Sequence, residues 1–176
     1  MTEYEEKKIR LKDQIQAYAE EGCIVAFSGG VDSSLLLKLV CEAAGKSDRI
    51  YAVTMQTRLH PVCEIEHAKK VAEEIGASHL VIPVDELEEA GIRQNPPDRC
   101  YLCKKNLFTK ILQKAEELGI QNILEGTNED DLHVYRPGLK AIRELGVISP
   151  LAEAGFTKEE VRRLAEEYGL SHPVLL

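Results

Sequence analysis

Residues 23–34 read CIVAFSGGVDSS, a succession that predicts a strand, a glycine turn and the start of a helix. The apolar run at residues 23–27 predicts a buried strand, and Asp32-Ser33-Ser34 opens an apolar helical pattern. Between them, Ser28-Gly29-Gly30 forms a turn in which the backbone can approach a ligand closely. A strand that passes through a glycine turn into a helix N-terminus binds anions, because backbone N–H groups and the helix dipole favour negative charge. We therefore expect residues 28–34 to hold phosphate.

The spacing of this loop differs from two common nucleotide-binding motifs. It matches neither the GxGxxG dinucleotide fingerprint nor the GxxxxGK[ST] loop, and it contains no lysine. The alternative is a serine- and glycine-rich turn that merely precedes a core helix. The strand–loop–helix context favours phosphate binding.

Composition sets wide limits on the kind of protein. The chain has 176 residues, of which 44% are hydrophobic and 30% charged, and this suits one α/β domain with a sizeable core. No apolar run approaches the roughly 20 residues that span a bilayer, and the charged start MTEYEEKKIRLKD is unlike a secretory signal peptide. Five cysteines, an odd number, favour reduced thiols in the cytoplasm. A net charge of −8 disfavours a nucleic-acid partner, which usually needs a basic patch.

Short apolar strands alternate with helical patterns along the chain. This is typical of a parallel sheet with helices on both faces. We predict a single domain over residues 1–176, an open doubly wound α/β sheet of about five strands, in which residues 1–21 form a surface helix. The expected strands are 23–28, 50–55, 79–84, 121–126 and 147–151, and the expected helices are 3–20, 33–45, 62–76, 101–118, 138–145 and 157–168.

Polar residues follow two of the predicted strands. In such sheets, ligands bind beyond the carboxyl ends of the strands. Thr54 ends the second strand, where backbone groups can recognise an adenine or ribose edge. Gly126 and Thr127 end the fourth strand and offer a close backbone approach to the nucleotide. The alternatives are an ordinary strand residue at Thr54 and a plain turn at 126–128.

The segment NPPDRCYLCKK, residues 95–105, carries Cys100 and Cys103 at CxxC spacing. Both sulfurs are expected on one side of a tight turn or first helical turn, where they can chelate a metal, form a redox pair or supply a thiolate. No partner CxxC or HxxxH pair completes a zinc site in this sequence. A purely structural pair is the alternative. Cys23 and Cys41 lie in apolar patterns and are expected to be inert core thiols.

A third segment, EGTNEDD at residues 125–131, runs on to Arg136. Clustered carboxylates beyond a strand end can help to hold Mg²⁺, which prefers oxygen ligands and phosphate. Arg136 can pair with a carboxylate or phosphate of a second substrate. The alternative is a solvated acidic loop with a Pro-Gly turn.

Together, SGGVDSS, NPPDRCYLCKK, DLHVYRPGLKA and TKEEVRRLAEEYGL resemble the LarE-type ATP-dependent sacrificial sulfur transferases of the PP-loop ATP pyrophosphatase superfamily. The resemblance runs from about residue 5 to residue 170. SGGVDSS alone is shared with GMP synthetase, NAD synthetase and tRNA thiolases. The second and third of these segments favour the LarE type over the other members.

The resemblance implies a two-stage reaction that serves synthesis of the nickel-pincer cofactor. ATP adenylates a carboxylate of a pyridinium dicarboxylate mononucleotide and pyrophosphate leaves; a sulfur nucleophile then displaces AMP. Asp32 is the implied Mg²⁺ ligand, and Asp32, Cys100, Cys103 and Arg136 are the implied catalytic residues. The implied pyrophosphate site is Ser28, Gly29, Gly30, Asp32, Ser33 and Ser34. Some members take the sulfur from a cysteine of their own, and others use three cysteines around a 4Fe–4S cluster.

The sequence departs from the family pattern at its end. Family members continue beyond the position of Leu170 into a segment with a further cysteine, whereas no cysteine follows Cys103 here. We expect this C-terminal family segment to be missing, and a homo-oligomer or a partner chain to supply it. Cys100 and Cys103 are then candidate iron–sulfur ligands. Two other functions stay open: an ammonia-using ligase of the NAD or GMP synthetase kind or a tRNA thiolase, and a non-catalytic ATP-binding module.

Overall fold

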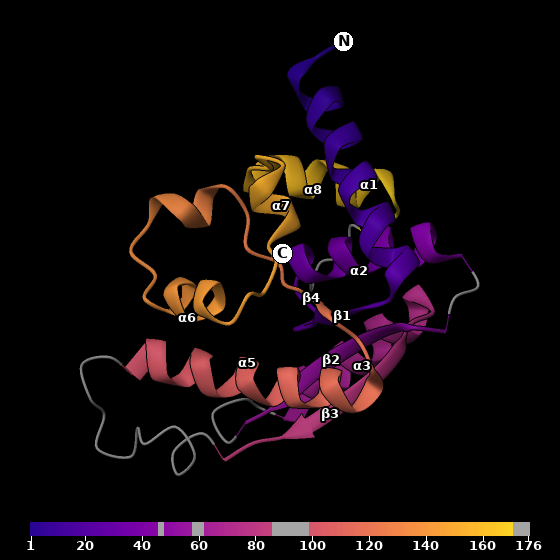
Figure 1. The fold of residues 1–176 in the computed structure, drawn as a ribbon. Coiled ribbons are helices and arrows are strands. Elements are labelled where there is room, and N and C mark those ends of the chain that lie inside the picture. The colour runs from indigo at the N-terminus through magenta and orange to yellow at the C-terminus, as the bar shows by residue number, and fades with distance from the viewer. Residues whose placement is uncertain (46–47, 58–61, 86–98, 171–176) are drawn as a thin grey trace.

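Four parallel strands form the centre of the protein. The computed structural model describes residues 1–45, 48–57, 62–85 and 99–170. Within these residues the sheet has the order β3-β2-β1-β4, so the chain reverses its direction of strand addition after β3 (Figure 1). In the register, Val25 of β1 pairs with Ala52 of β2 and Leu124 of β4. The strands are β1 (Cys23–Ala26), β2 (Ile50–Gln56), β3 (Ser78–Pro83) and β4 (Asn122–Leu124).

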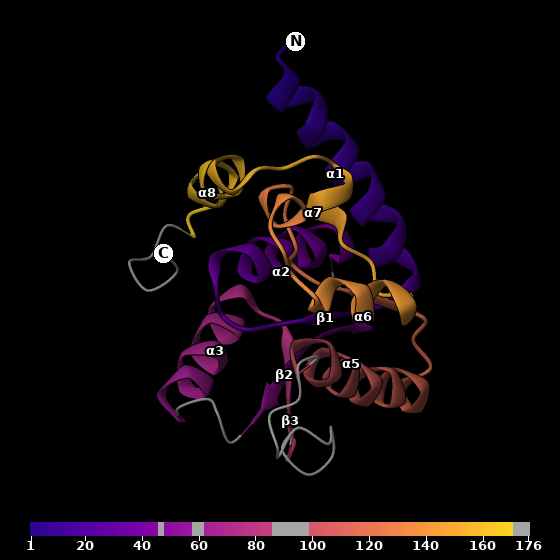
Figure 2. The same ribbon diagram turned by 90° about the vertical axis from the view of Figure 1, so that its left-hand side faces the viewer.

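Helices cover both faces of this sheet, as Figure 2 shows from the side. On one face, α1, α2, α3, α7 and α8 share a hydrophobic core; on the other, α5 and α6 do. The described helices are α1 (Glu3–Glu21), α2 (Val31–Ala44), α3 (Val62–Ile75), α5 (Arg99–Leu118), η1 (Asp130–His133), α6 (Gly138–Glu144), α7 (Pro150–Glu153) and α8 (Lys158–Glu167). The predicted doubly wound α/β fold is confirmed.

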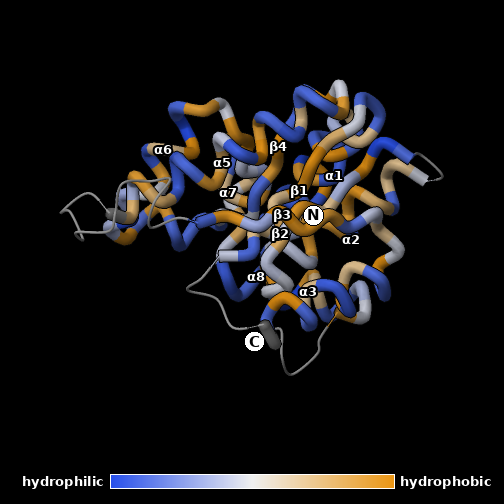
Figure 3. Tube along the Cα trace, turned by 90° about the horizontal axis from the view of Figure 1, so that it is seen from below, coloured by the Kyte–Doolittle hydropathy of each residue, from blue (hydrophilic) through white to orange (hydrophobic). Residues whose placement is uncertain are grey.

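Successive side chains of β1 pack alternately into the two hydrophobic cores. Cys23 and Val25 join the core under α2, whereas Ile24 joins the core under α5. All three are fully buried, because a central parallel strand is covered on both faces. Hydropathy along the chain follows this layering, with hydrophobic residues along the central strands and hydrophilic stretches on the outer turns (Figure 3).

The N-terminal helix packs on the surface of the first layer, as predicted. Thr2 and Glu5 form a capping box at the start of α1. Helix α1 then buries Leu11, Ile15 and Ala19, which recur at helical spacing on one side. The capping box predicted at Thr157 also forms, at the start of α8.

The predicted fifth strand is wrong in extent. At residues 147–151 only Ile148 pairs with the sheet, through a parallel bridge to Leu124. The Ile148 N–H donates to the Ile123 carbonyl at 2.9 Å, and the chain turns into α7 two residues later. Pro150 has no N–H for a ladder and occupies the first turn of α7, so the strand cannot continue.

Two further sequence expectations have different outcomes. The long irregular stretch around Asn95-Pro96-Pro97 lies outside the described residues. No helix in the described part of the chain is long and apolar enough to cross a bilayer. The extent of a single domain over residues 1–176 stays a prediction.

Candidate functional site

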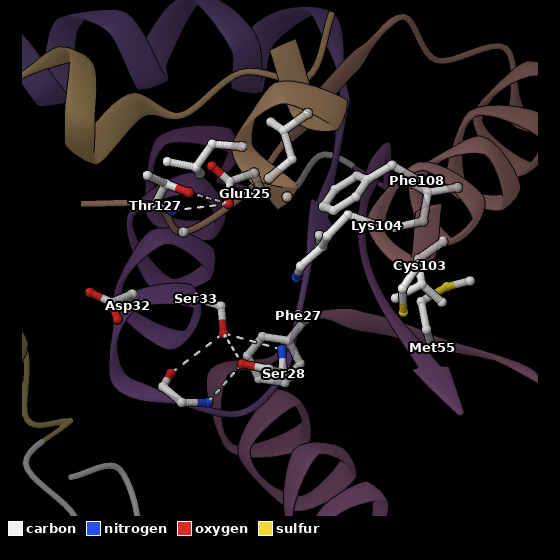
Figure 4. A pocket seen from close by; sticks show the side chains of 18 of the residues that line it. Phe27, Ser28, Asp32, Ser33, Met55, Cys103, Lys104, Phe108, Glu125 and Thr127 are labelled. Atoms are coloured by element: carbon white, nitrogen blue, oxygen red, sulfur yellow. Dashed lines mark hydrogen bonds between the residues drawn. The ribbon is translucent and has the colours of Figure 1, made fainter. Parts of the chain in front are cut away.

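A pocket of about 840 Å³ lies at the carboxyl ends of the strands. One wall is the turn from β1 into α2 together with the end of β4, and the opposite wall is the start of α5 with the turn into α6 (Figure 4). Two of the predicted site residues, Gly29 and Ser34, do not line it. The predicted residues that do are Ser28, Gly30, Asp32, Ser33, Thr54, Cys100, Cys103, Gly126, Thr127 and Arg136.

Two serine hydroxyls organise the loop between β1 and α2. The backbone N–H of Ser28 donates to Ser33 Oγ at 3.2 Å, and Gly30 N–H donates to Ser28 Oγ at 3.3 Å. The two hydroxyls also lie 3.2 Å apart, a contact drawn in Figure 4. Gly30 precedes α2 and has no side chain to cap the first-turn N–H groups. The loop therefore presents a shaped, uncapped helix N-terminus to the pocket, which suits an anion.

The glycine at position 29 is required by its surroundings. Its φ of +86° lies in the left-handed region that other residues rarely adopt. A Cβ atom there would come within 3.2 Å of the Ala68 Cα and of the His67 ring. Gly29 thus lies close against α3 and does not line the pocket. Ser34 is fully buried in the core side of α2, so its side chain also lies away from the pocket.

The end of β4 packs directly on the first turn of α2. A Cβ atom on Gly126 would lie 3.1 Å from both the Ser33 N and the Asp32 Cβ. The absence of a side chain lets the two segments touch, although they lie almost a hundred residues apart in sequence. This close approach brings Thr127 to the pocket beside the loop between β1 and α2.

Asp32 is held by two side chains from late in the chain. The Lys158 ammonium donates to Asp32 Oδ2 at 2.6 Å, and the Asn128 amide donates to Oδ1 at 3.0 Å. Lys158 is itself placed by its backbone N–H, which donates to Asp130 Oδ2 at 2.8 Å. Sequence reasoning missed Lys158; the only local signal was its position directly after the helix-capping Thr157.

The chemistry of Asp32 fits a magnesium ligand. Asp32 lies in the first turn of α2 and lines the pocket, and Mg²⁺ is commonly held by one or two carboxylates together with substrate phosphates. Among the described residues, no group of three or more His, Cys, Asp or Glu side chains could hold a metal without such help. A bound Mg²⁺ would therefore need phosphate oxygens to complete its coordination.

Glu125 is a buried carboxylate at the floor of the pocket. It accepts hydrogen bonds from the backbone N–H of Thr127 at 3.1 Å, from the Thr127 hydroxyl at 2.8 Å and from the Ser149 hydroxyl. Burial raises the pKa of Glu125 above its usual range, while these bonds and the charge of Lys104 oppose the rise. The sequence placed Glu125 in an acidic loop, but its role in fixing Thr127 depends on burial that no motif signals.

Arg136 lies at the pocket rim, paired with an acid of the same loop. Its Nη2 is 3.1 Å from Asp131 Oδ1. Asp131 and Asn128 in turn exchange two hydrogen bonds, each from a backbone N–H to the other's side chain, at 3.0 and 3.1 Å. The Arg136 side chain is 56% exposed, so it is available to an anionic group that enters the pocket.

The hydroxyl of Thr54 is used within the protein. It donates to the Phe27 carbonyl at 2.7 Å and lies 2.7 Å from His79 Nε2. Burial, with a smaller contribution from the Lys69 charge, lowers the pKa of His79, and this favours the neutral ring. The side chain of Thr54 therefore ties β1 to β2, and only its backbone remains for a nucleotide.

The opposite wall carries the two cysteines of the CxxC segment. Cys100 is exposed and Cys103 is half-buried, and both line the pocket from the first turn of α5. Two thiolates do not complete a 4Fe–4S site, and the described residues offer no third ligand beside them. Cys23, by contrast, is fully buried in the core, where burial raises its pKa to about 12. This confirms the expected burial of Cys23.

Comparison with known proteins assigns the chain to a family. The family model for NAD synthase matches residues 3–116. The chain belongs to the NAD synthase family. It is also 40% identical over 148 residues to the pyridinium-3,5-bisthiocarboxylic acid mononucleotide synthase of Lactiplantibacillus plantarum. The aligned residues make up 84% of this chain and 53% of that protein. These matches confirm the predicted relationship to the PP-loop superfamily and to its LarE-type members.

Solved structures support the fold. The NH3-dependent NAD synthetase of Campylobacter jejuni superimposes with a TM-score of 0.72 at 17% identity, over 99% of this chain and 77% of that one. The U34-tRNA thiolase of Methanococcus maripaludis, solved with its [4Fe-4S] cluster, gives 0.70 at 17% identity, over 97% of this chain and 67% of the thiolase. The chain spans about half the length of the curated LarE-type relative. All of these proteins are enzymes, which confirms the prediction of an enzyme family.

Proposed function

We propose that the chain acts as the ATP-binding part of a LarE-type adenylating sulfur transferase. The observation that carries this proposal is that one pocket brings the phosphate loop at residues 28–33 opposite the two thiols of α5. A nucleotide bound on the first wall would expose its reacting phosphate toward the second. The acceptor would be a carboxylate of a pyridinium dicarboxylate mononucleotide, and the product would serve synthesis of the nickel-pincer cofactor.

ATP would bind with its pyrophosphate on the first wall. The N–H groups of the first turn of α2, together with the hydroxyls of Ser28 and Ser33, would hold the pyrophosphate oxygens. Mg²⁺, held by Asp32 and phosphate oxygens, would neutralise the charge of the leaving pyrophosphate. The backbone around Thr54 and the turn at Gly126 and Thr127 would contact the nucleoside.

Adenylation would activate the acceptor. A carboxylate oxygen attacks the α-phosphorus, the bond from that phosphorus to the bridging oxygen breaks, and pyrophosphate leaves with the bonding electrons. The product is an acyl adenylate, whose AMP is a good leaving group. Arg136 at the rim would hold a second anionic group of the acceptor during this step.

Sulfur transfer would follow from the second wall. A thiolate of Cys100 or Cys103 attacks the carbonyl carbon, and AMP leaves to give a thioester. Loss of the cysteine Cα proton and cleavage of its Cβ–S bond would then release the thiocarboxylate and leave dehydroalanine. These thiols stay reduced in the cytoplasm, where we place the reaction. We further propose that the working enzyme is a homo-oligomer or includes a partner chain.

The family match supports a second candidate, an ammonia-using ligase. The NAD synthase model covers residues 3–116, and the adenylation step would be the same. Ammonia would then attack the acyl carbon in place of the thiolate. Cys100 and Cys103 would have no part in that reaction, which separates the two candidates.

Pyrophosphate release tests the proposal. The chain is incubated with ATP, Mg²⁺ and the pyridinium dicarboxylate mononucleotide, and its intact mass is then measured. The proposal expects acceptor-dependent pyrophosphate and a protein that has lost the mass of one hydrogen sulfide. In matched controls, C100S and C103S variants would still release pyrophosphate, but the variant that lacks the donor would keep its mass. Amide formation that requires ammonium and ignores both substitutions would favour the ligase instead.

A further inference from the structure

The structure assigns a catalytic role to Lys104, which directly follows the CxxC pair: it binds the α-phosphate of the nucleotide from the α5 side of the pocket. The inference rests on the proposed adenylation and names the group that would stabilise its transition state. Lys104 lies next to Cys103 in sequence and lines the pocket.

The direction of the side chain is the first observation. Figure 4 shows Lys104 leaving α5 and pointing across the pocket toward the wall that carries Ser28 and Ser33. Its Nζ lies 5.9 Å from the centre of the Phe108 ring, which forms an apolar flank. The ammonium therefore faces the phosphate loop from the opposite side.

The second observation is that this cation has no competing anion bound to it. Two described cations line the pocket. Arg136 is paired with Asp131, whereas Lys104 forms no hydrogen bond or ion pair within the described ranges of the chain. The buried Glu125 feels its charge, but the carboxylate already accepts three hydrogen bonds from Thr127 and Ser149. A cation that points into a partly apolar pocket and has no bound anion favours binding of an anionic ligand.

The third observation is that Gly138 leaves space for the Lys104 side chain. A Cβ atom on Gly138 would lie 2.6 Å from Lys104 Cγ, closer than real Cβ contacts allow. Cγ lies near the root of the lysine side chain, so the whole side chain would have to change rotamer. The glycine at the start of α6 therefore keeps the Lys104 stem over the turn and its ammonium in the pocket.

These positions match the charge that adenylation develops. With the pyrophosphate on the α2 wall, the α-phosphorus lies toward α5, where the acceptor and the thiols approach. Negative charge on the α-phosphate oxygens grows as the acceptor attacks, and a preplaced cation stabilises it most in a site with little water. The adjacent Lys105 cannot do this, because it does not line the pocket and donates to Glu144 at 3.3 Å and to the Tyr101 hydroxyl at 3.0 Å.

Ligand protection of lysines tests the inference without requiring turnover. The whole chain is acetylated lightly, alone or with AMP, adenosine or pyrophosphate, and the modification of each lysine is measured by peptide mass spectrometry. AMP is expected to slow modification of Lys104 at least about fivefold and to leave Lys105 unchanged, because an ion-paired amine reacts more slowly. Adenosine, which lacks the phosphate, is expected to protect neither. Equal protection by AMP and adenosine, protection by pyrophosphate alone, or no protection by AMP would overturn the inference.

Variants add a kinetic readout. K104M is expected to lower acceptor-dependent pyrophosphate release roughly 30-fold with little change in the Kd for ATP, because the lost contact strengthens in the transition state. G138A should give a loss in the same direction, and K105M, the matched control, should leave the rate unchanged. A K104M rate within twofold of wild type would refute the role. If the wild-type chain releases no pyrophosphate, the proposed function fails, and the AMP protection experiment still decides the assignment of Lys104.

Discussion

The two walls of the pocket differ in how firmly the chain fixes them. On the α2 wall, Ser33 and Thr127 are 6% and 7% exposed, and each is held by hydrogen bonds within the loops. On the α5 wall, Cys100 and Arg136 are exposed. Tyr101 and Lys105 contact Glu144 at the surface of this wall, while Phe108 and Ile142 pack in the core behind it.

The difference indicates a division of labour. Ser33 and Thr127 are buried and hydrogen-bonded, so they are held in place before a ligand arrives, and binding the nucleotide proposed for this wall would cost little ordering. An exposed wall can adjust its longer side chains to a second substrate. Substitutions in the α2 wall are therefore expected to cause the larger losses of activity. In the α5 wall, the exposed thiol is expected to react fast with alkylating reagents.

Removal of the Asp32 carboxylate should have the largest effect. D32A deletes the proposed Mg²⁺ ligand and also leaves Lys158 without its partner, so pyrophosphate release should fall roughly 100-fold or more. D13A is the matched control, because Asp13 is exposed on α1 and does not line the pocket. Pyrophosphate release by D32A within threefold of wild type would mean that the α2 wall is not the nucleotide site.

Thiol reactivity should distinguish the α5 wall from the core. Cys100 is exposed, whereas Cys23 is fully buried with its pKa raised to about 12 by that burial. Because the thiolate is the reactive form, iodoacetamide at mildly alkaline pH should modify Cys100 at least about 100-fold faster than Cys23. Peptide mass spectrometry over a time course measures both rates in one sample. Comparable rates would show that the α5 wall is no more accessible than the core.

Two glycines with similar backbone angles separate strain from packing. Gly29 and Gly76 have φ of +86° and +89°, so alanine at either position should cost roughly 1–2 kcal/mol of unfolding free energy. Only at Gly29 would the new Cβ also press on Ala68 and His67; at Gly76 nothing lies within 4 Å. G29A should therefore lose more stability in chemical denaturation and also weaken ATP binding, whereas G76A should bind ATP normally. Equal losses of unfolding free energy in both variants would show that packing of Gly29 against Ala68 and His67 does not matter.

The smallest effect is the pH dependence from Glu125. Burial raises its folded pKa above the ordinary 4.5, so the folded protein favours the protonated form. The stability that this group contributes is present below about pH 4.5 and is lost as pH rises through the raised pKa. The unfolding free energy of wild type minus that of E125Q should thus fall with rising pH.

A second carboxyl gives the opposite sign as a control. The pKa of Glu144 is lowered, first by its hydrogen bond from the Tyr101 hydroxyl. Its contribution is present above its ordinary pKa and lost as pH falls through the lowered one, so wild type minus E144Q should rise with pH. Urea denaturation across the acidic range measures both differences, and equal slopes would contradict the buried state of Glu125.

The elements of this fold were largely predictable from local sequence signals. Strand and helix periods, the glycine turn at residues 28–30 and the capping residue Thr157 each act within a few residues. Of the twelve predicted site residues, all but Gly29 and Ser34 line the pocket. The fifth strand failed because Pro150 ends pairing after a single bridge at Ile148, an outcome that depends on one residue outweighing an apolar run.

The residues that sequence reasoning missed depend on contacts between distant segments. Lys158 reaches Asp32 across 126 positions, and nothing near either residue signals the pair. Glu125 is read as one of several acids until its burial beneath Thr127 and Ser149 is known. Lys104 becomes distinct from Lys105 only when helix α5 is oriented and Gly138 is seen beneath its stem.

The transfer of a carboxylate oxygen to AMP is the direct test of adenylation in this pocket. The pyridinium dicarboxylate mononucleotide is labelled with ¹⁸O in its carboxylates and incubated with the chain, ATP and Mg²⁺, and the nucleotide products are analysed by mass spectrometry. We expect AMP that carries a single ¹⁸O atom, together with unlabelled pyrophosphate, because the acceptor oxygen stays on the α-phosphorus when AMP leaves. Unlabelled AMP, or ADP with orthophosphate, would contradict an acyl adenylate formed in this pocket.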